Sequence, residues 1–160
     1  MSQHKPIRLD HWIVAALLMA MALIAFVNVL SRYFIHFSIG ATEEITINLF
    51  VWMTVIGTGI AFERGAHLGM VTFFNLFSLK MRRQLVLLSG LLGAVLFVLV
   101  GIYMIQAIYD EVTMFQATSA ALGIPVWIYY AGVPIFSVFV FRGIYRGTRS
   151  RLAELDREGN

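Results

Sequence analysis

The chain has 160 residues, of which 59% are hydrophobic and 13% are charged, and its mean hydropathy is +0.80. Soluble domains average about 25% charged residues, so this composition excludes an ordinary soluble globule and a disordered chain. The formal net charge of +3 does not indicate nucleic-acid binding, because the basic residues gather at a few segment ends, and the absence of cysteine excludes disulfides and thiolate sites. We therefore expect an integral membrane protein.

A helix needs about 20 mostly apolar residues to cross the hydrocarbon of a membrane. Four stretches meet this requirement, and they predict a single all-α membrane domain, residues 1–160, with transmembrane helices at about 12–34, 44–63, 84–110 and 124–145. Pro125 suits the first turn of the last helix, where its missing N–H costs nothing. Pro134 lies within the same helix and predicts a kink there.

The distribution of Lys and Arg predicts the orientation of these helices. Eleven of the 12 lie in the N-terminal tail, in the connection between the second and third helices, and in the C-terminal tail. The first connection contains only Arg32, and the third contains Asp110 and Glu111 but no basic residue. Both termini are therefore expected in the cytoplasm.

The connection between the second and third helices is long enough to contain structure of its own. Residues 68–80 are mostly apolar, and basic residues follow them. We interpret this segment as an interfacial amphipathic helix on the cytoplasmic surface, with Lys80, Arg82 and Arg83 at the lipid phosphates. The alternative is that the segment lengthens the second or the third transmembrane helix.

The positions of the ionisable residues argue against catalysis and against transport by this chain alone. Every Asp, Glu, Lys, Arg and His lies outside the four apolar cores or at their edges, whereas ion pathways and charged-substrate sites place such residues within the membrane. The four histidines lie near the predicted membrane surfaces, without the placement of haem ligands or the spacing of a zinc site. We expect neither an enzyme nor a bound cofactor or metal.

Polar residues flank the second helix at both of its ends. Arg32 ends the first helix and Glu43 and Glu44 begin the second, so a helical hairpin would bring them together as an ion pair on the outer side. Glu63, Arg64 and His67 form a comparable group on the inner side, at the level of the lipid headgroups. An exposed ion pair contributes only about 0–1 kcal/mol, so the outer pair would set the geometry of the hairpin more than its stability.

Trp52 lies about 12 Å into the second helix, at a rise of about 1.5 Å per residue, whereas Trp12 and Trp127 lie near the predicted interfaces. The indole N–H of Trp52 needs a hydrogen-bond partner at this depth. We expect that partner within the bundle, and contact with a larger protein is the alternative. Close helix packing within the bundle is predicted at three pairs of small residues, with contact with another chain as the alternative: Ala16 and Ala20, Gly57 and Ala61, and Ser89 and Gly93.

Several of these residues belong to an ordered set of motifs. The set comprises Asn28-Val-Leu-Ser-Arg32-Tyr33-Phe34, Thr42-Glu43-Glu44 followed by Trp52 and Gly57, Gly59-Ile-Ala-Phe-Glu-Arg64-Gly-Ala-His67, and Ser119-Ala-Ala-Leu-Gly123-Ile-Pro125-Val-Trp127 with Pro134. In this order, over about residues 28–145, the set resembles the small membrane subunit of tripartite ATP-independent periplasmic (TRAP) transporters.

The resemblance implies a fold and a role. Small subunits of this family have four helices and brace a large membrane subunit, which works as an elevator and holds the substrate and sodium sites. A periplasmic binding protein delivers an organic anion, typically a carboxylate, and the sodium gradient drives its uptake across the bacterial inner membrane. This chain would then be a multi-pass scaffold whose partners are the large subunit, the binding protein and phospholipids, with any sodium held by the large subunit.

We expect the motif residues to lie at partner interfaces or to anchor the chain in the membrane, and none to be catalytic or to bind substrate. They are Asn28, Arg32, Tyr33, Glu43, Glu44, Trp52, Arg64, His67, Gly123, Pro125, Trp127 and Pro134. Arg32, Glu43 and Glu44 are further expected to shape the outer surface where the binding protein docks. Two other functions stay open: a membrane anchor of a respiratory oxidoreductase, and a self-associating four-helix exporter.

Overall fold

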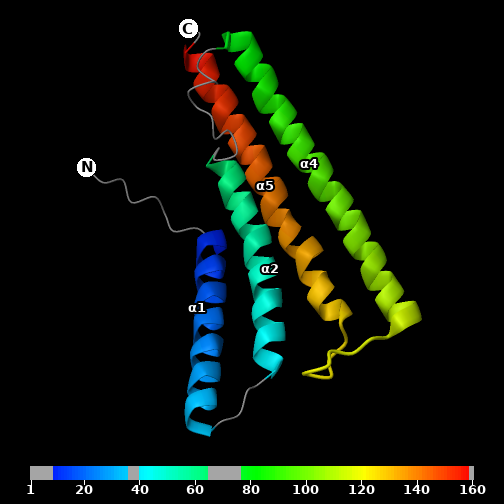
Figure 1. Ribbon diagram of the computed structural model, residues 1–160. Helices are drawn as coiled ribbons and strands as arrows, with labels where there is room; N and C mark the ends of the chain where they lie inside the picture. The colour runs from blue at the N-terminus through cyan, green and yellow to red at the C-terminus, as the bar shows by residue number, and fades with distance from the viewer. Residues whose placement is uncertain (1–8, 36–39, 65–76, 159–160) are drawn as a thin grey trace.

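The structure, a computed structural model, describes residues 9–35, 40–64 and 77–158. This part of the chain consists of four long helices, two short π-helical turns and their connections (Figure 1). The elements are α1 (Leu9–Leu30) continued by η1 (Ser31–Ile35), α2 (Gly40–Glu63), α4 (Leu79–Asp110) continued by η2 (Glu111–Phe115), and α5 (Trp127–Glu158).

All four helices are long and apolar enough to cross a membrane. The predicted all-α membrane fold with four spans is therefore confirmed. The largest extensions beyond the predicted spans are those of α4, which begins at Leu79 instead of 84, and of α5, which continues to Glu158 instead of 145. Hydropathy marks only the part of a helix that faces hydrocarbon, whereas backbone hydrogen bonding continues both helices into the polar region.

The predicted interfacial helix at 68–80 falls mostly outside the described residues. Of its described part, Phe77 and Ser78 are not helical, and Leu79 and Lys80 form the start of α4. This part of the segment therefore belongs to the approach to α4 and to its first turn. An interfacial helix before it stays a prediction.

The helices form a single row. α1 packs on α2, α2 packs on α5, and α5 packs on α4, so that the order in space is α1, α2, α5, α4 (Figure 1). The last helix in the chain thus lies between α2 and α4. Because α1 and α4 flank the row, they leave most of their large apolar side chains exposed.

The buried core of the row is small and lies among α2, α4 and α5. Its buried members are Val55, Val133, Val140 and Ile144, and partly buried apolar side chains packed around them include Phe62, Phe97, Val100 and Met104. Lipid accepts apolar side chains as readily as protein does, so helices in a membrane associate through close van der Waals packing rather than through the burial of a large core.

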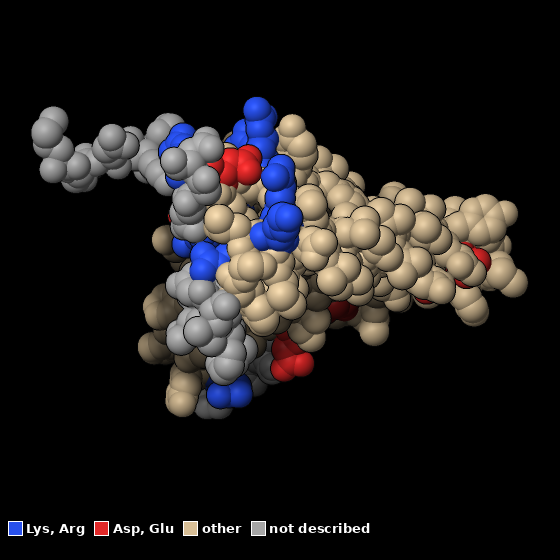
Figure 2. Space-filling view, turned by 90° about the horizontal axis from the view of Figure 1, so that it is seen from above, with Lys and Arg blue, Asp and Glu red and all other residues tan. Residues whose placement is uncertain are grey.

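The two ends of the row differ in charge. α1 and α4 begin, and α2 and α5 end, at what we call the basic end, and Figure 2 shows Lys and Arg side chains gathered on the face seen from that end. The charged residues described there are Arg64, Lys80, Arg82, Arg83, Arg142, Arg146, Arg149, Arg151 and Arg157, with Asp10, Glu63, Glu154 and Asp156. The opposite, acidic end has Arg32 with Glu43, Glu44, Asp110 and Glu111. The predicted separation of charge is therefore present between the two ends.

Candidate functional site

Trp52 is held between α2 and α5. Its indole N–H donates a hydrogen bond to the carbonyl oxygen of Tyr129, with Nε1 and O 3.1 Å apart. The ring lies against Gly132, where a Cβ atom would overlap the indole, and its centroid is 5.8 Å from that of the Phe136 ring. The indole N–H thus has the partner that its depth requires, and this partner lies within the chain.

α2 and α5 approach each other closely at glycines. A Cβ atom on Gly143 would overlap the backbone carbonyl of Gly59, and a Cβ atom on Gly59 would lie 2.5 Å from the carbonyl oxygen of Phe139. One turn further along α5, a Cβ atom on Gly147 would overlap the carbonyl oxygen of Phe62. Small residues allow helix backbones to make such contact, so these glycines determine how α2 and α5 pack.

Gly143 and Gly147 are not among the predicted packing pairs, although they have the small-xxx-small spacing. Arg146 lies between them, so the stretch looks in the sequence like the end of the apolar run. Among the pairs that are predicted, Gly93 does pack closely, because a Cβ atom there would lie 2.6 Å from the Phe62 ring. Gly57 has open space around it in the described part of the chain, so it does not pack closely within the bundle, and contact with another chain at this position stays a prediction.

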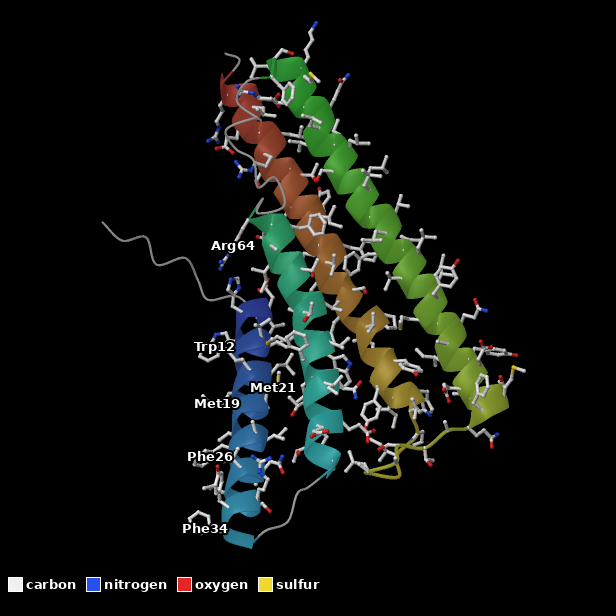
Figure 3. All side chains as sticks on the ribbon, in the orientation of Figure 1. Trp12, Met19, Met21, Phe26, Phe34 and Arg64 are labelled. Atoms are coloured by element: carbon white, nitrogen blue, oxygen red, sulfur yellow. The ribbon has the colours of Figure 1, made fainter. Side chains whose placement is uncertain are left out.

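Adjacent residues at the end of α2 connect it to both of its neighbours. Arg64 donates a hydrogen bond to Nε2 of His11 on α1, at 3.0 Å, and Nδ1 of the same imidazole lies 3.4 Å from the carboxylate of the buried Asp10. Glu63 lies 3.9 Å from the guanidinium of Arg146 on α5. Figure 3 shows Arg64 where α2 ends, near the start of α1. This candidate residue therefore joins two helices of the row.

At the acidic end, Glu44 contacts the connection between α4 and α5. Its carboxylate interacts with the side chains of Ser119 and Tyr129 and with the backbone of Ala121. The Tyr129 hydroxyl is buried and has no well-aligned hydrogen-bond partner among the described residues. The carboxylate of Glu44 therefore lies close to this hydroxyl without forming a well-aligned hydrogen bond with it.

The predicted ion pair of Arg32 with Glu43 and Glu44 is not formed in the described part of the chain. The helix continues past Arg32 to Ile35 as η1, and Arg32 is exposed in this last turn. Glu43 is also exposed, whereas Glu44 is partly covered by the contacts just described. The hairpin is therefore not closed by these charges.

Residues 116–126, the connection between α4 and α5, have a defined backbone. Ser119 is buried; its hydroxyl accepts a hydrogen bond from the N–H of Leu122, and its carbonyl oxygen accepts one from the N–H of Gly123. Gly123 has a φ of 67°, a left-handed conformation that glycine adopts without strain. The candidate residues Gly123 and Glu44 thus shape the same connection, one by its backbone and the other by its carboxylate.

The two candidate prolines have different roles from each other. Pro125 pairs with Thr118 in an isolated β-bridge, and α5 begins only at Trp127. The expectation that Pro125 occupies the first turn of the helix is therefore wrong, because the bridge holds it in the connection. Pro134 does lie inside α5, which continues through it, and a kink at this position stays a prediction.

A matched pair of substitutions distinguishes the structural role of Glu44 from that of its neighbour Glu43. We expect Glu44→Gln to weaken the contacts with Ser119 and Ala121, and the amides of residues 116–126 then to exchange hydrogen severalfold faster, because local opening becomes easier. The measurement is hydrogen–deuterium exchange of the purified chain. Glu43→Gln, which changes an exposed neighbour, should leave the exchange unchanged, and an equal effect of both variants would contradict the assignment.

The predicted headgroup residues surround the start of α4 at the basic end. Lys80 is exposed, and the guanidinium of Arg83 lies 3.6 Å from the carboxylate of Asp156 on α5. Arg82 donates a hydrogen bond from Nε to the carbonyl oxygen of Phe77, at 3.0 Å. The three residues therefore lie together at one edge of the row.

The side of α1 that faces away from α2 carries large apolar side chains. Trp12, Met19, Phe26 and Phe34 point away from the row, whereas Met21 points toward α2 (Figure 3). The first four are each at least 60% exposed. This face is available for contact with lipid or with another protein.

The remaining candidates lie at the acidic end or outside the described residues. Asn28 is partly exposed near the end of α1, Tyr33 is 72% exposed on η1, and Trp127 is 38% exposed at the start of α5. His67 falls outside the described residues. Contacts of these four with a partner or with lipid stay predictions.

The chemistry of these sites is that of helix packing and anchoring. In the part of the chain that the structure describes, no group of three or more His, Asp or Glu side chains could hold a metal ion. The polar contacts instead join helices to each other or to a connection, as those of Arg64, Glu63 and Glu44 do. These contacts thus hold the helices of the row and the connection between α4 and α5 together.

Comparisons with known proteins all find similarity to the same group of transporter components. Residues 9–146 match the family described as the DctQ component of tripartite ATP-independent periplasmic transporters. The ectoine TRAP transporter small permease protein TeaB of Halomonas elongata is 28% identical over 131 residues, which cover 80% of this chain and 66% of that protein. The C4-dicarboxylate TRAP transporter small permease protein DctQ of Vibrio cholerae is 27% identical over 81 residues, covering 51% of this chain and 35% of the relative.

A third relative, the C4-dicarboxylate TRAP transporter small permease protein DctQ of Rhodobacter capsulatus, is 29% identical over 98 residues, covering 59% of this chain and 41% of its own length. The chain thus spans less than two thirds of each of these relatives. The family match, in contrast, extends from the start of α1 into the second half of α5. This chain belongs to the DctQ family, the small permease components of tripartite ATP-independent periplasmic transporters.

Proposed function

We propose that this chain is the scaffold subunit that braces a large, elevator-type membrane subunit in sodium-coupled uptake of organic acids. The observation that carries this proposal is the single row of helices. In the order α1, α2, α5, α4, the flanking helices α1 and α4 present long apolar faces to their surroundings. A row of this kind can serve as a fixed support against which part of a larger membrane protein moves.

The internal contacts of the row support a static role. α2 and α5 are locked together by backbone contact at Gly59 and Gly143 and by the Trp52 hydrogen bond. Moving parts of proteins are drawn from regions with few stabilising contacts. α2 and α5, in contrast, are joined by close backbone contact and by a hydrogen bond. The solute and sodium sites are proposed to lie on the large subunit.

The proposed orientation places the basic end in the cytoplasm and the acidic end in the periplasm. The excess of Lys and Arg at the basic end supports it, because cytoplasmic connections carry more of these residues. The exposed Arg32, Tyr33 and Glu43 then lie on the periplasmic surface, together with the ordered 116–126 connection. We place the docking of a periplasmic binding protein on this surface, in a bacterial inner membrane.

Organic acids are the proposed solutes, and the names of relatives support this class. Two of the similar small permeases belong to transporters named for C4-dicarboxylates, and one belongs to a transporter named for ectoine. Since small permeases of one family serve different solutes, we place the choice of solute on the other subunits.

The experiment that tests the proposal is recovery of the tagged chain from its native membrane in a mild detergent, with the partners identified by mass spectrometry. We expect one large polytopic membrane protein at equal stoichiometry. The variant Gly101→Ala should recover it equally well, because a Cβ atom at Gly101 meets no other atom within 4 Å. Gly143→Ala should recover less, because it disturbs the row.

Other outcomes of the recovery would overturn the proposal. A chain that is recovered alone or only as a homo-oligomer does not brace a large subunit. Recovery with redox subunits and a haem absorbance band would favour the respiratory anchor instead. If a reconstituted complex took up its solute without a sodium gradient, the proposed sodium coupling would be wrong. The proposed scaffold role would be unaffected by that result.

A further inference from the structure

Basic and apolar side chains alternate where the chain approaches and begins α4. Phe77, Leu79 and Met81 are 38%, 43% and 45% exposed. Lys80 is exposed between them, and 59% of the Arg83 side chain is exposed. We call Phe77–Arg83 the α4 entry segment.

The last turns of α5 bring further basic residues to this segment. The contact of 3.6 Å between Arg83 and Asp156 holds the end of α5 beside the start of α4. Arg149 and Arg157 are exposed on these turns, and Arg151 pairs with Glu154 at 2.9 Å. Figure 2 shows basic side chains gathered at this end. The junction of α4 and α5 therefore has a surplus of exposed positive charge.

This surface would be unfavourable in contact with water alone, because water would then hydrate the three apolar side chains that lie exposed among the cations. The apolar stretch of α4 begins at Leu85, directly after the α4 entry segment, and Leu87 and Leu88 are 48% and 51% exposed on the next turn. A phospholipid supplies both kinds of partner, since its phosphate contacts basic residues and its acyl chains contact apolar ones. The charges also do not serve the helix itself, because the first turn of α4 has no acidic residue and cations there oppose the helix dipole.

We propose that the α4 entry segment, with the exposed arginines at the end of α5, binds anionic phospholipid headgroups in preference to zwitterionic ones. Lys80 and Arg83 contact the negative headgroup, and the acyl chains follow Leu87 and Leu88. Arg83 keeps its contact with Asp156 while binding lipid, because a guanidinium has five N–H donors. The inference requires the chain to span a membrane, but it does not depend on the transport function.

The test measures how many phosphatidylglycerol and phosphatidylcholine molecules stay bound to the purified full-length chain in native mass spectrometry. We expect the unmodified chain to prefer phosphatidylglycerol. A basic residue at a membrane surface contributes about 1 kcal/mol, so K80Q/R83Q should lower the preference about tenfold to thirtyfold. K80R/R83K, which keeps both charges, should retain it.

Arg32→Gln is the matched control, because it removes an exposed arginine from the opposite end of the row. It should leave the preference unchanged. An unchanged preference in K80Q/R83Q, or an equal loss in Arg32→Gln, would overturn the proposal. Displacement of the lipid by inorganic phosphate would also overturn it, since the junction would then be a site for free anions.

Discussion

Gly143→Ala is expected to force α2 and α5 apart and to lower the free energy of unfolding by about 3 kcal/mol. The added methyl group would overlap the backbone carbonyl of Gly59, and backbone atoms cannot turn aside as the end of a side chain can. Overpacking of a well-packed interior costs about 1–3 kcal/mol, and we expect the upper part of that range here. The measurement is unfolding of the purified chain by titration with sodium dodecyl sulfate.

Two glycines without neighbours provide the controls for this experiment. A Cβ atom at Gly57 or at Gly101 would meet no other atom within 4 Å. Alanine is more favourable than glycine in a helix by about 1 kcal/mol, so Gly57→Ala and Gly101→Ala should leave stability unchanged or raise it slightly. If Gly143→Ala behaved as these two do, close contact between the backbones of α2 and α5 would not be what holds the row together.

The second large effect is expected from substitutions at Trp52 and Gly132. The change in stability caused by Gly132→Ala should reverse its sign when Trp52 is also replaced. In the unmodified chain, Gly132→Ala should be destabilising by about 2 kcal/mol, because the new methyl group overlaps the indole. Trp52→Ala should cost about 3 kcal/mol, through loss of packing and of the hydrogen bond to Tyr129. In the Trp52→Ala chain, Gly132→Ala should become neutral or stabilising, because the overlap no longer exists.

A double-mutant cycle measures this coupling directly. Residues in contact show interaction energies of about 0.5–3 kcal/mol, and the overlap predicts a value in the upper half of that range. Trp52→Phe isolates the hydrogen bond, whose loss should cost about 1 kcal/mol. Additive effects of the two alanine substitutions would show that the indole does not lie against Gly132.

The membrane spans could be predicted because each depends only on the length and hydropathy of a single segment of the chain. An apolar stretch of sufficient length must be helical in lipid, since no other open structure satisfies its backbone. The ends of α4 and α5 could not be predicted in the same way. The stretch from Arg142 to Glu158 is polar enough to leave the hydrocarbon, and the helix continues there with Asp156 beside Arg83 of α4.

The candidate site was harder to predict, because its contacts join residues that are distant in the sequence. The sequence places Arg32 near Glu44, and the hairpin suggests an ion pair. The actual neighbours of Glu44 are Ser119 in the connection between α4 and α5 and Tyr129 in the first turn of α5, both more than 70 residues away. Charge and depth indicate that a residue needs a partner, but only the packing order of the helices decides which partner it meets.

The position of α5 in the row also has a consequence for biosynthesis. The ribosome makes α5 last, yet α2 and α4 meet each other mainly through it. Three helices therefore enter the membrane before the helix on which two of them pack has been made. α1 and α2 can pack on each other as soon as both are inserted, whereas α4 lacks most of its packing until α5 has been made. Insertion of α5, rather than of any of the three helices made before it, therefore brings α2 and α4 together in the row.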